Sequence, residues 1–68
     1  MDKEKIVLNI IKEYLYRGLT EEELKQAGLV GLKIAEEKYD EQADFSFESY
    51  AVWWIRHSIL QALAEKTK

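Results

Sequence analysis

The chain has 68 residues, 47% of them hydrophobic and 34% charged, with a net charge of −3 at pH 7. This length suits one small domain over residues 1–68, and the composition is typical of a soluble globular protein and excludes a disordered chain. With no cysteine and one histidine, disulfide bridges and the usual zinc sites are excluded, and we expect no cofactor. No apolar run approaches the roughly 20 residues that cross a bilayer, and the N-terminus lacks the form of a signal peptide, so we expect a cytoplasmic protein without a membrane partner.

The first predicted helix covers about residues 3–16. Its apolar residues recur at helical spacing and predict one buried face: Ile6, Val7, Ile10, Ile11, Tyr14 and Leu15. Gly18 follows this stretch and suits a left-handed stop just past the helix end.

The second predicted helix covers about residues 21–39. Thr20 and Glu23 have the spacing of a capping box, in which each side chain bonds the other's backbone N–H. Leu24, Gly28 and Gly31 share one face of this helix. Because a helical glycine costs about 1 kcal/mol relative to alanine, we interpret the glycine pair as a flat strip where another helix approaches closely.

A polar segment, Asp-Glu-Gln-Ala-Asp at residues 40–44, interrupts the periodicity and predicts a loop. The third predicted helix covers about residues 46–65, with Ser46 as its N-cap. Three helices with short connections predict an all-α protein, a small three-helix bundle.

Catalytic chemistry has little support in the sequence. His57 and Ser58 are neighbours on a helix and do not face each other, and the same holds for Glu36 and Glu37. We therefore expect that the protein is not an enzyme.

The most informative stretch is aromatic and is followed by two basic side chains; it contains Phe45, Phe47, Tyr50, Trp53, Trp54, Arg56 and His57. Aromatics at helical spacing usually form a core, and the alternative is a surface on which unpaired bases stack. Neighbouring helix positions point about 100° apart, so one packing face cannot hold both tryptophans. The pattern leaves both interpretations open and places Trp54 nearer the packing face and Trp53 nearer His57.

These residues resemble a known family. The stretch FSFESYAVWWIRHSILQALAE is similar to the promoter-recognition helix of bacterial RNA polymerase sigma factors of the housekeeping class, whose pattern is F-S-T-Y-A-x-W-W-I-R-Q-A-I. Upstream, LKQAGLVGLKIAEEKYD resembles D-L-x-Q-E-G-x-x-G-L-x-x-A-x-x-K-F-D, and residues 14–19 resemble Y-x-x-R-G-L. The similarity covers roughly residues 7–65.

The resemblance implies the all-helical second conserved region of a sigma factor. Such a domain docks on the clamp helices of the largest subunit of the RNA polymerase core. It also recognises and melts the minus-ten promoter element by capturing flipped bases of the non-template strand. The positions that match the family's DNA-binding residues are Tyr39, Phe45, Tyr50, Trp53, Trp54, Arg56 and His57. The positions that match its polymerase contacts are Glu23, Leu24 and Gln26.

The sequence also departs from the family pattern. Ala27-Gly28-Leu29 replaces a more polar segment, an acidic segment fills residues 40–44 where basic residues are common, and Leu60-Gln61 replaces a small polar residue and an arginine. His57 stands where a glutamine is usual. Fewer basic groups predict weaker DNA binding with a flatter salt dependence.

Two functions remain open at this stage. The first is a promoter-melting sigma domain, which we expect to be a fragment of a longer factor. The alternative is a sigma-like interaction module that binds polymerase or a regulator, such as an anti-sigma factor, without recognising DNA.

Overall fold

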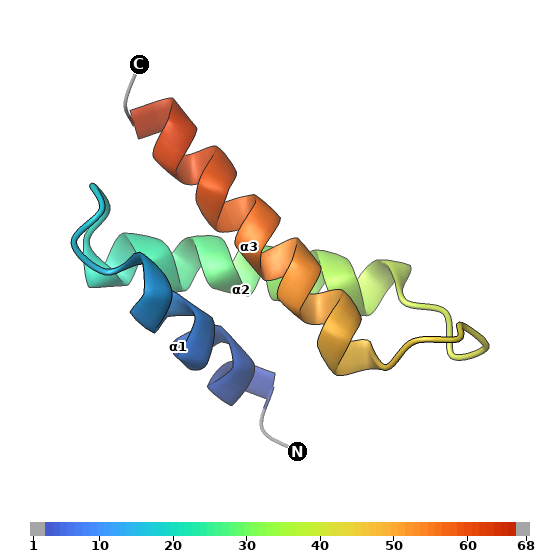
Figure 1. Ribbon diagram of the computed structural model, residues 1–68. Helices are drawn as coiled ribbons and strands as arrows, with labels where there is room; N and C mark the ends of the chain where they lie inside the picture. The colour runs from blue at the N-terminus through green and yellow to red at the C-terminus, as the bar shows by residue number, and fades with distance from the viewer. Residues whose placement is uncertain (1–2, 67–68) are drawn as a thin grey trace.

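The computed structural model describes residues 3–66 as three α-helices. Helix α1 spans Lys3–Tyr14, α2 spans Glu21–Lys38 and α3 spans Phe47–Lys66. The predicted all-α three-helix fold is confirmed, with helix ends within two residues of those expected. Figure 1 shows α3 crossing α2 near the middle of both helices, with α1 beside the N-terminal half of α2.

The core lies where the three helices meet. Each helix contributes apolar side chains at helical spacing, and the largest of those that are almost completely buried are Leu24, Ile55, Ile59 and Val7. Within residues 3–66, the buried apolar side chains are those of Ile6, Val7, Ile10, Ile11, Leu19, Leu24, Leu32, Ala35, Ala51, Ile55 and Ile59. The faces predicted for the first two helices are therefore the faces that pack.

Helix α1 ends two residues earlier than the sequence pattern predicted. Tyr16 adopts a left-handed conformation with φ of 65°, and Gly18 follows with φ of 127°. The positive φ angles of these two residues, which lie on either side of Arg17, turn the chain away from the helix. Leu19 then returns to the core. The left-handed residue expected at Gly18 is thus preceded by another at Tyr16. The Tyr16 side chain is almost fully exposed.

The predicted capping box at the start of α2 is confirmed. The Thr20 hydroxyl accepts a hydrogen bond from the Glu23 backbone N–H at 3.1 Å, and a Glu23 carboxylate oxygen accepts one from the Thr20 N–H at 2.9 Å. Two of the unpaired donors at the helix N-terminus are satisfied in this way.

Gly28 and Gly31 form the close approach expected of them. A Cβ at Gly31 would lie 2.6 Å from the backbone oxygen of Trp54 and 2.7 Å from the Cα of Ile55. A Cβ at Gly28 would lie 2.6 Å from a methyl group of Val7 on α1. The two glycines therefore set how closely α2 packs against both other helices.

The loop between α2 and α3 is closed by hydrogen bonds within itself. A carboxylate oxygen of Asp40 accepts a bond from the backbone N–H of Gln42 at 2.9 Å. The Ser46 hydroxyl accepts one from the Ser49 N–H at 3.2 Å, as expected of an N-cap. The Tyr39 hydroxyl spans the loop and donates to the backbone oxygen of Phe45 at 3.0 Å.

Across residues 3–66, none of the helices has the length and apolar character of a membrane span.

Candidate nucleic-acid interface

Six of the seven predicted DNA-binding residues lie on one continuous aromatic surface. With Phe47, they form a chain of ring contacts that runs from the end of α2, through the loop, and along α3. We call this set the aromatic surface; its members are Tyr39, Phe45, Phe47, Tyr50, Trp53, Trp54 and His57.

The first part of the aromatic surface is centred on Tyr39. Its ring lies 6.1 Å from that of Phe45, 5.3 Å from Phe47 and 5.8 Å from Tyr50, measured between centroids. Phe45 stacks on Tyr50 with a centroid separation of 5.3 Å. Together with the hydrogen bond from Tyr39 to the loop, these contacts fix the loop against the start of α3.

The second part lies along α3 and divides the two tryptophans. Trp53 is 59% exposed and stacks almost parallel on His57, at 5.4 Å between centroids and 3° between planes. Trp54 is half-buried and meets both rings edge-on, at 5.0 and 6.0 Å. The division expected from helix geometry is therefore observed: Trp54 faces the packing side and Trp53 faces solvent beside His57.

Exposure separates the members that can receive a ligand from those that support them. Trp53, His57 and Phe45 are exposed, Phe45 to 48%. Tyr39 and Tyr50 are half-buried beneath them. Exposed flat rings on a rigid base are the arrangement that stacking on unpaired bases requires.

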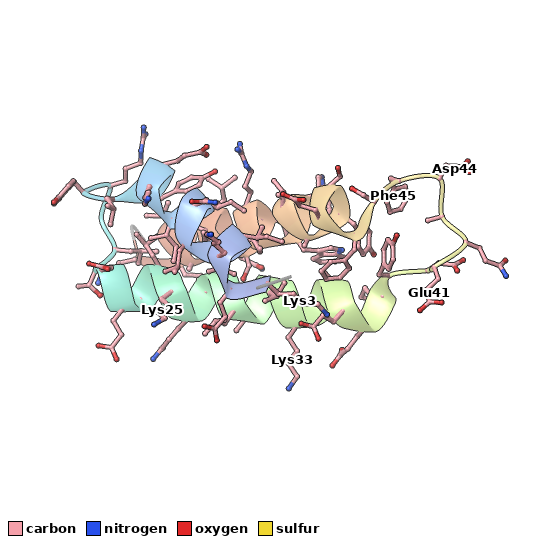
Figure 2. All side chains as sticks on the ribbon, turned by 90° about the horizontal axis from the view of Figure 1, so that it is seen from below. Lys3, Lys25, Lys33, Glu41, Asp44 and Phe45 are labelled. Carbon is pink, nitrogen blue, oxygen red and sulfur yellow. The ribbon has the colours of Figure 1, made fainter. Side chains whose placement is uncertain are left out.

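The loop beside this surface is acidic. Glu41 and Asp44 both lie on the loop, Asp44 beside Phe45 and Glu41 nearer the end of α2 (Figure 2). No basic residue occurs between residues 39 and 55 of the sequence. The surroundings of the aromatic surface therefore favour contacts with bases over contacts with phosphates.

Lys3 is a basic residue that sequence reasoning missed. Its ammonium nitrogen lies 4.9 Å from the ring centroid of Phe47 and 3.9 Å from a carboxylate oxygen of Glu36. The packing of α1 against α2 therefore brings a positive charge to the rim of the aromatic surface. Because Lys3 and Phe47 lie 44 residues apart, no local motif could have revealed this.

Arg56 is the predicted DNA-binding residue that has no ring contact with the aromatic surface. A guanidinium nitrogen lies 3.0 and 3.2 Å from the two carboxylate oxygens of Glu13 on α1. Both side chains are about half exposed. In this structure Arg56 therefore joins α3 to α1.

The three predicted polymerase contacts occupy different environments. Leu24 is completely buried, so its side chain supports the surface of α2 from within the core. Glu23 and Gln26 lie on the rim of a groove of about 450 Å³ between the start of α2 and the end of α3. Its apolar lining comes from Leu19, Ala27, Val30 and Ala62.

Glu23 already has partners within the chain. The ammonium group of Lys66 donates to its two carboxylate oxygens at 2.7 and 3.0 Å. The hydrogen bond from Lys66, followed by that from the Thr20 backbone, lowers the pKa of Glu23 from 4.5 to about 2. The carboxylate is therefore ionised throughout the neutral range.

Comparison with known proteins identifies the family. The model of the sigma-70 region 2 family matches residues 3–68. The chain therefore belongs to the sigma-70 region 2 family, as the resemblance of its motifs predicted.

Within that family it is similar to housekeeping sigma factors. It is 41% identical over 64 residues to RNA polymerase sigma factor SigA of a Nostoc species, which is 94% of this chain and 16% of that protein. The same identity and share of this chain are found with SigA of a Synechocystis species and of Listeria monocytogenes, of which 15% and 17% are covered. The chain thus spans about one sixth of the length of these relatives.

Proposed function

We propose that this chain acts in transcription initiation by binding RNA polymerase core and recognising the minus-ten promoter element. The aromatic surface captures unpaired bases of the non-template strand and so stabilises the melted element. The observation that carries this proposal is the exposed Trp53–His57 stack, which ring contacts through Trp54 and Tyr50 connect to the exposed ring of Phe45.

Stacking on such rings is energetically sufficient to hold melted bases. An exposed aromatic side chain contributes about 1–3 kcal/mol for each stacked base. Trp53 can meet a base without disturbing the core, because α3 contributes Ala51, Ile55 and Ile59 to the core and leaves Trp53 exposed. Tyr39, Tyr50 and Trp54 then act mainly as the support that fixes the exposed rings.

Contact with the polymerase core is proposed at α2. Family membership and the names of the relatives, RNA polymerase sigma factors, support a core-binding role. Glu23 and Gln26 on the groove rim are the residues proposed to meet the clamp helices of the largest subunit. Leu24 supports them from within the core.

The two binding events depend on each other. A net charge of −3 gives the chain little attraction for the phosphate backbone. Polymerase core therefore supplies the local concentration at the promoter, and the aromatic surface supplies recognition. Arg56 acts as a brace between α1 and α3. His57 borders the part of the aromatic surface that meets the upstream edge of the element.

The test is an oligonucleotide titration of the chain, alone and bound to polymerase core. A labelled single-stranded minus-ten oligonucleotide and a scrambled one are compared by anisotropy, because Trp53 is itself a fluorophore and its removal would distort tryptophan quenching. We expect Trp53→Ala to abolish selective binding. Leu8→Ala, which truncates an exposed apolar residue of α1, should leave it unchanged. Equal binding of the two oligonucleotides by the unmodified chain would refute base recognition.

A second function is favoured by the acidic loop. Asp40, Glu41 and Asp44 adjoin Phe45 and would repel DNA, whereas a basic protein partner would be attracted. Under this alternative the chain is a protein-interaction module for polymerase or an anti-sigma factor. Binding to core without any response to the oligonucleotide would favour it.

A further inference from the structure

The carboxylate of Glu23 has no free oxygen. One oxygen accepts hydrogen bonds from the Thr20 N–H at 2.9 Å and from Lys66 at 2.7 Å, and the other accepts from Lys66 at 3.0 Å. The Lys66 contact joins the last turn of α3 to the first turn of α2, across 43 residues of sequence. A basic group of a partner can therefore take the two hydrogen bonds that Lys66 donates only if Lys66 leaves.

The ion pair stands over the groove between α2 and α3. Glu23 and Lys66 both line it, and its apolar wall includes Ala27, Val30 and Ala62. Val30 is 54% exposed, so the groove opens to solvent along an apolar edge. Such a groove fits a helix that carries a basic side chain beside small apolar ones.

We infer that Lys66 is an intramolecular competitor for the polymerase-binding site, occupying the Glu23 carboxylate until a basic side chain of the core replaces it. This inference rests on the proposed function, because it takes Glu23 to be a contact for polymerase core. It adds Lys66 as a residue that weakens binding to polymerase core, whereas Glu23 strengthens it.

The exchange is physically accessible because the pair is only partly buried. The side chains of Lys66 and Glu23 are 47% and 42% exposed, so water can solvate the ammonium group when it is released. Exposed pairs of this kind are weak and are screened by salt. The bond from Thr20 does not involve Lys66, so the N-terminus of α2 stays capped after the exchange.

The experiment measures the affinity of the full 68-residue chain for immobilised polymerase core at low and high salt. Lys66→Gln frees the carboxylate, and we expect it to tighten binding about two- to fivefold at low salt, the range of one exposed ion pair. The gain should disappear at high salt. Lys12→Gln is the matched control, because it makes the same charge change on α1 and should not tighten binding.

A second variant separates competition from a general charge effect. Glu23→Gln removes the charge but retains a residue that completes a capping box. We expect it to weaken binding, and we expect Lys66→Gln to have no additional effect in that background. Circular dichroism of each variant checks that helix content is unchanged.

Each result decides between the inference and its alternatives. If Lys66→Gln leaves the affinity unchanged or weakens it, Lys66 is no competitor. If it tightens binding equally in the Glu23→Gln background, Lys66 acts through long-range repulsion and the inference is wrong. If neither the unmodified chain nor any variant binds core, the proposed function fails together with the inference. If the chain binds core but Lys66→Gln has no effect, only the inference is overturned.

Discussion

Trp53 and Trp54 are neighbours in the chain and differ in environment. The indole nitrogen of Trp54 is buried and has no hydrogen-bond partner among the described residues, whereas Trp53 is mostly in solvent. A substitution at Trp54 therefore alters packing as well as the surface. Trp53 is the position at which binding and stability can be changed separately.

Glu23 gives a prediction at the residue scale. Its pKa is lowered to about 2 in the folded chain, first by Lys66, from an ordinary value of 4.5. Because the folded pKa is the lower one, the ionised carboxylate contributes stability above about pH 4.5, which is lost as the pH falls toward 2. Lys66→Gln should raise the pKa of Glu23 and reduce the loss of stability over this range.

The pKa is measured by NMR titration of the side-chain carboxyl carbon, and the stability by thermal unfolding between pH 6 and pH 2. Lys12→Gln serves as the control. It should change neither the pKa of Glu23 nor the loss of thermal stability at acid pH. A Glu23 pKa that stays near 2 in Lys66→Gln would show that Lys66 does not hold this carboxylate in solution.

Individual residues show what the sequence could and could not predict. Helical periodicity placed Leu24 on the packing face with Gly28, while the family resemblance placed it at the polymerase contact, and the structure agrees with periodicity. The contacts of Arg56 with Glu13 and of Lys66 with Glu23 each span 43 residues. Such pairs depend on how helices cross and on side-chain rotamers, which no local pattern encodes.

At the scale of the elements, the α2–α3 crossing determines where the aromatic surface lies. Gly31 allows the backbone of α3 to approach α2 at Trp54 and Ile55. The same crossing brings the end of α2 beside the start of α3, where Tyr39 meets Phe47 and Tyr50. The periodicity predicted both the helices and the glycine contact, because they depend on local sequence.

Gly31→Ala should therefore be much more damaging than Gly28→Ala. The added methyl at Gly31 meets backbone atoms of α3, so α2 and α3 must separate. We expect this separation to cost about 1–3 kcal/mol or more. Helix propensity returns only about 1 kcal/mol. At Gly28 the obstacle is a side-chain methyl group of Val7, which can shift more readily than backbone. Urea unfolding of both variants tests this, and equal stabilities would contradict the close approach at Gly31.

For the whole molecule, small size and negative charge limit what the chain does alone. A domain of this length buries only about 60% of its unfolded surface, so its stability is small and a partner adds to it. The net charge of −3 and the acidic loop oppose DNA. The charge balance was evident from composition and the fold class from helical periodicity, whereas the position of Lys3 over Phe47 required the assembled bundle.

The charge balance predicts a shallow salt dependence for oligonucleotide binding. Single strands give a slope in log K against log salt of about −0.7 for each phosphate contact. With Lys3 as the cation beside the aromatic surface, we expect a slope of about −1 or shallower, and we expect Lys3→Gln to flatten it further. Lys33→Gln is the control, since Lys33 extends from α2 away from the other helices (Figure 2). A steep slope in the unmodified chain would mean that phosphates dominate binding.

The most direct test of the account is oligonucleotide binding by the chain bound to polymerase core. Anisotropy of a labelled minus-ten strand is measured against a scrambled strand, with the unmodified chain and with Trp53→Ala. We predict that the complex prefers the minus-ten strand and that Trp53→Ala removes this preference while core binding persists. A complex whose preference is unaffected by Trp53→Ala would contradict base capture on the aromatic surface.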